Sequence, residues 1–382
     1  MTAAAASPSP PAPLSPAACP VLVVKVGSAL LVAPDGTVRR DWLASLVADI
    51  AVRIADGQRV VIVSSGAIAL GARRLGLPKG GRASLEDAQA AAATGQIALS
   101  QCWAELLGAH TITAAQMLVT LDDLEDRRRF LNASATLRRL IALGVVPVIN
   151  ENDSVATEEI RFGDNDRLAA RIAQAAGAGG VVLLSDVDGL YTTNPKNDPD
   201  ARLVESVARI DARIRAMADG GSASGMGSGG MLSKLEAARI ATSAGAHLAI
   251  ANGTHYHPLD RLAQGGRCTV FTAGKLGKGR KLWLAGRMTA RGRIVVDAGA
   301  AAALAKGSSL LAAGAIAVEG RFARGDVVEI ATINGETIAR GLSEYDATDA
   351  ARITGLRSDA IAEILGHAPR SALVHRDQLV LL

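Results

Sequence analysis

Short apolar runs alternate with longer amphipathic stretches along the chain up to about residue 272. The runs are rich in Val, Leu and Ile, which predicts strands buried on both faces of a sheet. They occupy residues 21–26, 59–65, 145–150, 181–186 and 246–253, with a shorter one at 110–113. The stretches between them place apolar side chains at helical spacing, as at 41–55, 85–107 and 124–143. This alternation predicts an α/β domain with a doubly wound, mostly parallel sheet sandwiched by helices.

Beyond residue 273 the pattern changes to short β-type runs separated by turns. The stretch at 274–286 begins with GKLGKGRK, a composition typical of a linker between domains. The next β-type runs, with two helical stretches among them, are too short for a second α/β domain and predict a small mixed β-barrel at 287–370. Residues 371–382 are expected to pack on this barrel as a C-terminal strand or tail. The large domain then occupies residues 19–273.

The first 18 residues are mostly Ala, Pro and Ser and carry no Lys or Arg, so they lack the charged start of a signal peptide. We expect a disordered tail at 1–18. No apolar run approaches the roughly 20 residues that span a bilayer. Cys19, Cys102 and Cys268 lie far apart and form neither a disulfide pattern nor a metal-ligand pair, which suits a reducing compartment. The sequence therefore predicts a cytoplasmic protein without membrane contact and without a metal-ligating cluster of side chains.

A glycine-rich stretch, GMGSGGMLSK at residues 225–234, directly precedes a helical pattern. Glycines let backbone N–H groups approach an anion, and the start of the following helix carries a partial positive charge. Phosphate binding is one interpretation, with the Lys234 ammonium at the junction as a further charge. The other is a flexible connector, since Gly/Ser-rich runs commonly serve that role. The spacing is not that of a P-loop, so a nucleotide site here belongs to another fold.

Polar residues stand at the ends of several predicted strands. Lys25 interrupts the apolar run VLVVKV, and a lysine at that place is expected to face a ligand, to extend its charge to solvent or to form a buried ion pair. The second run ends in Ser64 and Ser65 before a helix. The third run continues into NENDSVATEEIRFGDND, in which residues 154–163 alternate enough to form a hairpin or flap. The clusters NEND and GDND are expected to flank this projecting element.

Seven motifs occur in one order along the chain, namely KVGSALL, VVIVSSGAIALG, FLNASATLRRL, VVPVINENDSVAT, FGDND, LLSDVDGLYT and GSGGMLSK. Together they resemble the glutamate 5-kinases of the amino acid kinase superfamily, and NEND followed by GDND distinguishes that family from related kinases of similar fold. The segments GRIVVDAGAAAALAKGSSLL, GRFARGDVVEI and VHRD look like the PUA domain of many bacterial members. The resemblance covers nearly everything after the tail. It departs slightly at Ser64 and Ser185, where threonine is common, and at Leu232.

The resemblance implies the reaction of ATP with L-glutamate to give ADP and L-glutamyl 5-phosphate, the first step of proline synthesis. A carboxylate is already a nucleophile at neutral pH, so the chemistry needs alignment and charge neutralisation but no general base. Lys25 and Lys234 are expected to neutralise the phosphoryl oxygens, assisted by Mg²⁺. Asp166 is expected to orient the two lysines or the hydrated metal, or, alternatively, to cap a helix.

By match to the family motifs, Ser65, Asp153 and Asn165 hold glutamate. We expect Asp153 to accept from its α-ammonium group, and Ser65 and Asn165 to donate to carboxylate oxygens. The residues matched to ATP binding are Lys25, Ser185, Asp186, Ser228, Gly229, Gly230, Met231, Leu232, Ser233 and Lys234. A kinase for another small carboxylate or for a carbamate is the alternative activity.

The family resemblance also implies inhibition by L-proline and assembly into a homodimer or homotetramer. PUA domains elsewhere bind RNA, and Lys275, Lys278 and Lys281 with Arg321 and Arg324 would give a modest basic surface. The same charges also fit a solvated face, and a formal net charge of +4 over 382 residues is too small to predict nucleic acid as the main partner. RNA binding is therefore expected only as an additional role.

Overall fold

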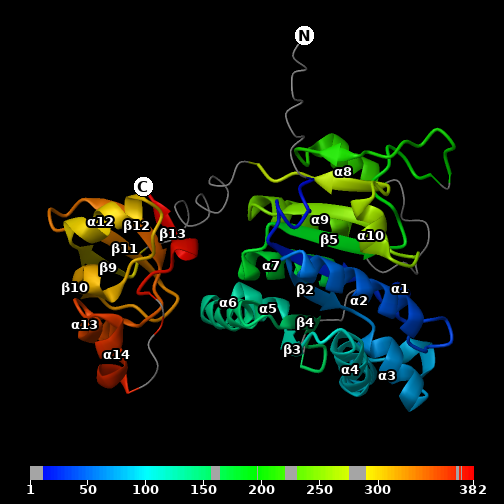
Figure 1. Ribbon diagram of the computed structural model, residues 1–382, viewed down its shortest axis with the longest axis horizontal. Coiled ribbons are helices and arrows are strands. Elements are labelled where there is room, and N and C mark those ends of the chain that lie inside the picture. Colours follow the sequence, from blue (N-terminus) through cyan, green and yellow to red (C-terminus); the bar gives the residue numbers. More distant parts are fainter. Residues whose placement is uncertain are drawn as a thin grey trace, which may run out of the picture. The chain divides into compact units, whose positions relative to one another are not determined.

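The computed structural model describes residues 12–155, 164–195, 197–219, 230–274, 290–366, 370 and 372–382. The chain divides into two compact units (Figure 1). Unit 1 comprises residues 1–124 and 133–274, and unit 2 comprises residues 125–132 and 275–382. Each unit has its own sheet and its own hydrophobic core.

Within the described ranges, unit 1 is built on an eight-stranded sheet with the order β3-β4-β2-β1-β5-β7-β8-β6. The strands are β1 (Val21–Val26), β2 (Arg59–Ser64), β3 (Ala114–Val119), β4 (Val146–Glu151), β5 (Gly180–Ser185), β6 (Ser206–Val207), β7 (His247–Asn252) and β8 (Cys268–Phe271). Neighbouring strands are parallel except β7 and β8, which pair antiparallel. The predicted doubly wound, mostly parallel sheet is confirmed.

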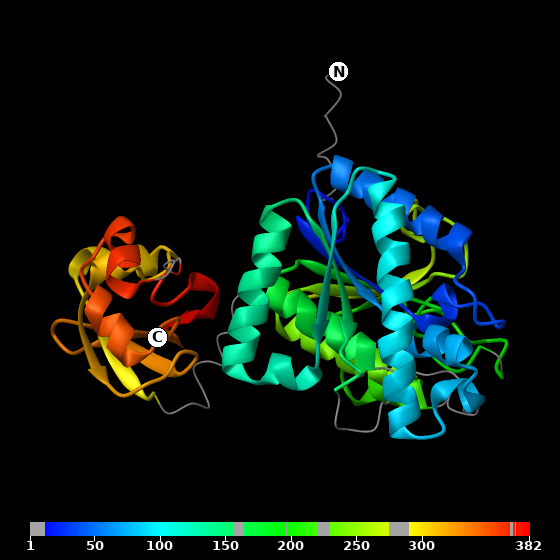
Figure 2. The same ribbon diagram turned by 90° about the horizontal axis from the view of Figure 1, so that it is seen from below.

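Helices cover both faces of this sheet (Figures 1 and 2). They are α1 (Ser28–Leu31), α2 (Arg40–Ala55), α3 (Ala67–Leu75), α4 (Leu85–Gly108), α5 (Leu121–Glu125), α6 (Arg127–Ala142), α7 (Asp164–Ala176), α8 (Ala212–Asp219), α9 (Met231–Ser243) and α10 (Pro258–Ala263). Leu22, Val24 and Val26 of β1 share a core cluster with apolar side chains of α2 and α4. Because side chains alternate along a strand, Lys25 points to the opposite face, where α7 packs on β1.

The α3–α4 contact is exceptionally close, and two glycines permit it. A Cβ added to Gly71 would lie 1.8 Å from the carbonyl oxygen of Ala91, and one added to Gly95 would lie 1.8 Å from that of Ala67. No side chain fits at either position, so the two helices touch backbone to backbone. This contact brings α4, the long cyan helix of Figure 2, up to the start of α3 and the end of β2.

Three local expectations need correction. The strand predicted at 110–113 is wrong, because α4 extends to Gly108, Thr111 turns the chain with a φ of 58°, and the strand β3 begins only at Ala114. The helix predicted at 124–143 is two helices, α5 and α6. The N-terminal segment is ordered in part, since Leu14 is buried in the core and its carbonyl accepts hydrogen bonds from Arg53 and Gln58.

Within the described ranges, unit 2 has a five-stranded sheet with the order β10-β9-β11-β12-β13. Its elements are β9 (Gly292–Val296), α12 (Ala298–Ala305), β10 (Ala315–Gly320), β11 (Val327–Thr332), β12 (Thr337–Leu342), α13 (Ala347–Ile353), α14 (Ser358–Leu365) and β13 (Leu379–Leu381). The helix α14 was not predicted. β13 pairs antiparallel with β12, so the C-terminal segment does form a strand on this sheet.

Candidate active site

The candidate site lies where parallel strands of unit 1 end together. The register pairs Val26 of β1 with Ser64 of β2, and Ser185 of β5 with Asn252 of β7. The carboxyl ends of open α/β sheets, at a point where the strand order reverses, are where such folds bind ligands. Here β1 lies between β2 and β5, so its end occupies the middle of that edge.

Two lysines and one aspartate form a buried cluster at this edge. The Lys25 Nζ lies 2.6 Å from Asp166 Oδ1, and the Lys234 Nζ lies 3.0 Å from Asp166 Oδ2. The three residues come from β1, α7 and α9, and only 8% of Lys25, 6% of Lys234 and none of Asp166 is exposed. We call these three residues the lysine–aspartate cluster. The sequence named all three but did not show that one carboxylate holds both ammonium groups.

Burial and mutual attraction set the charge states in the lysine–aspartate cluster. Burial alone would raise the pKa of Asp166, but the charges and hydrogen bonds of Lys25 and Lys234 outweigh it and hold that pKa below its ordinary value. The pKa of Lys25 is lowered, chiefly because burial disfavours its charge, although Asp166 opposes the shift. Two ammonium groups around one carboxylate leave a net positive charge in a site with little water, which suits a highly anionic ligand.

Lys234 belongs to a helix and not to the preceding loop. The helix α9 begins at Met231 with Gly230 as its N-cap, so residues 231–234 form its first turn. Their backbone N–H groups therefore stand at the positive end of the helix dipole. Ser228 and Gly229, together with the rest of the glycine run before Gly230, lie outside the described residues, as do residues 156–163 of the predicted flap.

A second group of polar residues lies beside the cluster and is linked by side-chain amides. The Asn165 Nδ2 donates to Ser65 Oγ at 2.7 Å and contacts the Ser64 carbonyl at 3.4 Å and Asn150 Oδ1 at 3.5 Å. Asn150 Nδ2 in turn donates to Gln96 Oε1 on α4 at 2.8 Å. We call Ser65, Gln96, Asn150 and Asn165 the amide network. The sequence predicted Ser65 and Asn165 as site residues but missed Gln96, which no motif marks.

In the amide network, the N–H groups of Asn165 have partners within the protein, although the sequence suggested them as donors to the substrate. These groups are directed at Ser65, Ser64 and Asn150, whereas the Asn165 Oδ1 is buried and accepts no hydrogen bond within the part of the chain that the structure describes. A buried acceptor without a donor is costly, so this oxygen is suited to receive a hydrogen bond from a ligand. Asn165 therefore presents an acceptor, while Ser65 accepts from Asn165 and keeps its hydroxyl hydrogen for another partner.

The remaining predicted residues lie at neighbouring strand ends. Asp153 follows β4. Burial lowers the pKa of Arg82, and the negative charge of Asp153 opposes this shift without outweighing it. Arg82 is a further cation that the sequence did not single out. Ser185 is buried at the end of β5, and its hydroxyl donates to Asp186 at 3.1 Å. The negative charge of Asp186 acts on Lys25 and raises its pKa, although less than burial lowers it.

Ser64, where the family commonly has threonine, keeps a structural partner. The indole N–H of Trp103, a fully buried residue of α4, donates to the Ser64 hydroxyl at 3.0 Å. This hydrogen bond connects the end of β2 with α4 next to the site. A serine in place of the usual threonine therefore still holds the end of the strand in position.

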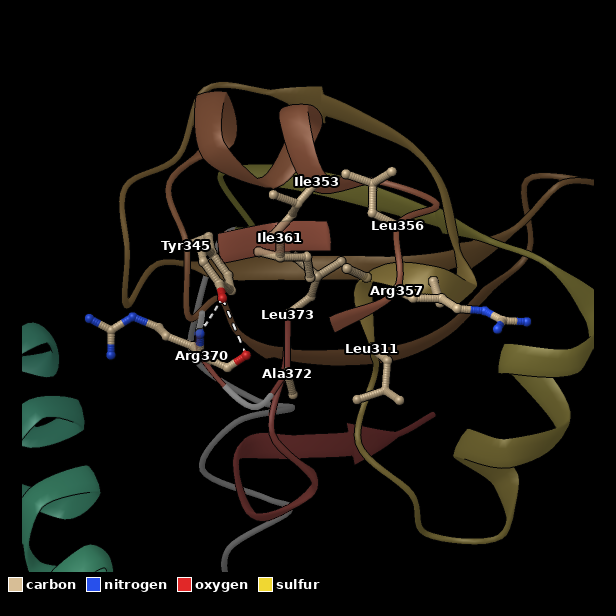
Figure 3. A pocket seen from close by; sticks show the side chains of 11 residues that line it. Leu311, Tyr345, Ile353, Leu356, Arg357, Ile361, Arg370, Ala372 and Leu373 are labelled. Carbon is tan, nitrogen blue, oxygen red and sulfur yellow. Dashed lines mark hydrogen bonds between the residues drawn. The ribbon is translucent and has the colours of Figure 1, made fainter. Parts of the chain in front are cut away.

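Unit 2 contains a separate small pocket of about 150 Å³ (Figure 3). Its lining is largely apolar, with Leu311, Ile353 and Leu373 among the contributors, and the guanidinium groups of Arg357 and Arg370 point away from it. A pocket of this kind offers no cluster of charges for phosphoryl transfer. Only the strand ends of unit 1 combine buried lysines, a carboxylate and an unsatisfied acceptor among the described residues.

Arg324 does not contribute to the basic surface that the sequence predicted on the small domain. Only 17% of the Arg324 side chain is exposed, and its guanidinium lies 3.5 Å from Glu344. Burial lowers its pKa, with Arg370 adding to that effect and Glu344 opposing it. Arg324 is thus not an exposed cation, and Lys275, Lys278 and Lys281 lie outside the described residues.

Comparison with known proteins agrees with this architecture. A model of the amino acid kinase family matches residues 20–252, and a model of the PUA domain matches residues 292–365. Glutamate 5-kinase of Sphingopyxis alaskensis is 68% identical over 367 residues, which cover 96% of this chain and 99% of that protein. The glutamate 5-kinases of Zymomonas mobilis and Novosphingobium aromaticivorans are 61% and 62% identical, over 96% and 95% of this chain and 92% and 96% of their own lengths. The chain therefore belongs to the amino acid kinase family and, within it, to the glutamate 5-kinases.

Two absences concern only the described residues. No helix among them is both long and apolar enough to cross a membrane. Nor do three His, Cys, Asp or Glu side chains come together there as a metal site.

Proposed function

We propose that the protein transfers the γ-phosphoryl group of ATP to the 5-carboxylate of L-glutamate, giving L-glutamyl 5-phosphate and ADP. The observation that carries this proposal is the lysine–aspartate cluster, in which Asp166 holds two buried ammonium groups at the shared edge of the sheet. Phosphoryl transfer between two anions needs concentrated positive charge and alignment more than acid–base chemistry. The product is the acyl phosphate that begins proline synthesis.

In this mechanism Lys25 and Lys234 approach the transferred phosphoryl group from two elements, β1 and α9. Asp166 fixes their positions without contacting the phosphoryl group, because both of its oxygens face the lysines. An ammonium group carries three N–H donors, so Lys25 and Lys234 are each suited to bind phosphoryl oxygens as well as Asp166. The substrate carboxylate attacks without a general base, since it is ionised at neutral pH. The positive charge is in place before the reaction, so the protein does not reorganise as charge moves.

Glutamate is held by the residues beside the lysine–aspartate cluster. The Asn165 Oδ1, which is buried without a hydrogen-bond donor, and the Asp153 carboxylate accept from the α-ammonium group. The Ser65 hydroxyl donates to a carboxylate oxygen of the substrate. Asp153 also lies within electrostatic reach of Arg82, whose cation adds to the positive potential that draws a dicarboxylate.

ATP is proposed to bind at the end of β5 and the start of α9. Ser185 and Asp186 face it from β5, and the first turn of α9, with the N-cap Gly230, directs N–H groups at its phosphates. Ser228 and Gly229 are assigned here by motif alone. Mg²⁺ is proposed as the divalent cation that accompanies the nucleotide; it would be held mainly by the phosphates, with the Asp186 carboxylate as a candidate protein ligand, and would supply further positive charge for the transferred group.

Several further properties rest on the family relationship and remain proposals. L-proline inhibits by competing at the glutamate site, and the protein assembles as a homodimer or homotetramer in the cytoplasm. Residues 19–273 form the catalytic domain and residues 287–370 the PUA-like domain, joined at 274–286. RNA binding by the PUA-like domain is a lesser role, because Arg324 is engaged within its own unit.

A substrate panel tests the proposed activity. Turnover of ATP should depend on L-glutamate and should be much slower with L-aspartate, N-acetyl-L-glutamate or carbamate. A faster reaction with one of the other acceptors would favour the alternative, a kinase for a different carboxylate or a carbamate. Removal of divalent cations with a chelator should abolish turnover, and added Mg²⁺ should restore it.

A further inference from the structure

We infer that Gln96 is a positioning residue for the substrate ammonium group, acting through the orientation of two asparagine side chains. This inference rests on the proposed function and extends it to the helix behind the pocket. Gln96 itself is separated from the Asn165 acceptor by Asn150, so its effect is indirect. The orientation of each amide group, with its N–H or its C=O end toward a given neighbour, decides this effect.

Helix α4 reaches the site because of its glycine. Gly95 lies against the backbone of α3 at Ala67, where no Cβ fits, and the next residue is Gln96. The half-buried Gln96 side chain meets Asn150, only 2% of which is exposed, at the end of β4. Two segments 54 residues apart in sequence are thereby joined by one hydrogen bond at the end of β4, where the candidate active site lies.

The orientation of Gln96 is fixed within its own helix. The Ser100 hydroxyl donates to the Gln96 carbonyl at 2.8 Å, which commits its hydrogen. Ser100 Oγ can then only accept, and Gln96 Nε2 donates to it at 3.2 Å. The other end of the Gln96 amide, Oε1, must therefore face Asn150.

This orientation passes to the two asparagines. Because Gln96 Oε1 is an acceptor, Asn150 turns its Nδ2 toward it at 2.8 Å and leaves its Oδ1 for Asn165. Asn165 faces this oxygen and the Ser64 carbonyl with its Nδ2, at 3.5 Å and 3.4 Å. If Asn165 were turned over, its own oxygen would oppose two other acceptors. Its Oδ1 is consequently held on the other side of the amide group, where it has no donor among the described residues.

Loss of the Gln96 acceptor removes one of the two groups that set this order, while the Ser64 carbonyl still favours the Asn165 N–H. Asn150 can then rotate its amide by 180° and offer N–H to Asn165, which raises the population of the turned-over Asn165 with its N–H groups where the oxygen had been. In this orientation the Asn165 N–H groups repel the substrate ammonium group, whereas in the original orientation the Asn165 Oδ1 accepts a hydrogen bond from it. The effect is largest for ligands that carry an ammonium group. A turned-over Asn165 would also present its oxygen to the Ser65 hydroxyl, so the Ser65 contact with a substrate carboxylate weakens to a smaller extent for every ligand.

Glutarate is the probe that isolates this effect, since it is glutamate without the ammonium group. In Gln96→Met, which keeps the side-chain length but removes the acceptor, we expect the KM for glutamate to rise about 10-fold. The inhibition constant of glutarate should rise clearly less than the KM for glutamate, and the KM for ATP and kcat should each stay within about 2-fold of the wild-type values. In Gln96→Glu an oxygen still faces Asn150, so the KM for glutamate should stay within about 3-fold of wild type.

Two controls keep the test decisive. Gln101→Met lies on the same helix, where Gln101 bonds only to the exposed Glu105 in the described structure, and should leave every constant unchanged. Ser100→Ala removes the group that orients Gln96 without altering Gln96, so it should raise the KM for glutamate in the same direction by a smaller factor, even if Gln96→Met folds poorly.

An unchanged KM for glutamate in both Gln96→Met and Ser100→Ala would overturn the positioning role. An equal rise in the glutamate KM and the glutarate inhibition constant would also overturn it, since that result indicates a general loss of packing. If the wild-type protein does not turn over glutamate at all, the proposed function itself is overturned, and this role with it.

Discussion

The lysine–aspartate cluster and the amide network lie side by side but are built on opposite principles. The cluster is charged and nearly sealed from solvent, and its geometry is held by attraction between full charges. The network is neutral, and its geometry is held by the directions of N–H and C=O groups. Charge can stabilise a transition state for phosphoryl transfer, whereas oriented neutral groups can distinguish one substrate from another. Changes in the cluster should therefore affect stability and kcat, and changes in the network should affect KM.

The largest effect is expected from Asp166→Asn. The substitution leaves two buried ammonium groups without their counter-charge, which should lower the free energy of unfolding by about 3–5 kcal/mol, in addition to reducing kcat. The matched control is Glu236→Gln on α9, where the Glu236–Arg239 pair is about half exposed and should contribute less than about 1 kcal/mol. Urea unfolding of the three proteins measures both differences. Equal stabilities for Asp166→Asn and Glu236→Gln would contradict the assignment of a buried charge cluster.

Next in size is the loss of activity in Lys234→Ala. This change should lower kcat by ~10²-fold or more, because it removes charge that neutralises the transferred phosphoryl group. Folding should be nearly preserved, since the Lys25–Asp166 pair remains as a neutral pair and the repulsion between two ammonium groups disappears. Steady-state kinetics together with a thermal melt test this. An unaltered kcat would show that Lys234 does not act on the transition state.

A moderate effect is expected on the alkaline side of the pH profile. Because the pKa of Lys25 is lowered from its ordinary 10.5, the ammonium group should lose its proton, and kcat should fall, at a pH below 10.5. In Lys25→Arg the charge persists to higher pH, so whatever activity remains should lack this alkaline fall. Log kcat measured against pH for both proteins decides the matter. The same alkaline fall in both would assign it to another group.

A smaller and more selective effect is expected from Asn165→Leu in the amide network. The substitution removes the acceptor for the substrate ammonium group, so the KM for glutamate should rise by about 10-fold to 100-fold. The KM for ATP should change little, because the nucleotide contacts other elements. Initial rates with each substrate varied in turn provide the comparison. A parallel rise in both KM values would mean that the two regions do not have separate roles.

The sequence predicted the charged region better than the neutral one, and the reason is physical. A lysine inside an apolar strand is unusual and requires a partner or a ligand. Lys25 can therefore be recognised as a candidate site residue from a single sequence. Gln96 sits in an alanine-rich helix where a polar residue is ordinary, and its partner Asn150 is 54 residues away. The hydrogen bond with Asn150, which depends on the close packing of α4 against α3, is what shows that this particular glutamine belongs to the site.

The fold shows the same division between strong and weak local signals. The buried strands β1, β2, β4, β5 and β7 are continuous β-branched or leucine-rich runs, and their positions were predicted closely. The edge strand β3 has the sequence AAQMLV, whose small and polar residues give little β-type pattern, and it was placed several residues too early. Helix α9 begins with Gly230 as N-cap and not with Ser or Asp, so its first turn looked like loop.

The central claim is that the lysine–aspartate cluster transfers phosphate to a carboxylate, and trapping the product tests it most directly. An acyl phosphate reacts with hydroxylamine to give a hydroxamate, which is measured by its colour with ferric ion. The wild-type protein with ATP, Mg²⁺ and L-glutamate should form one hydroxamate for each ADP released, and Lys234→Ala should form almost none. Release of ADP at the wild-type rate without hydroxamate would contradict the claim, because the phosphoryl group would then have passed to water.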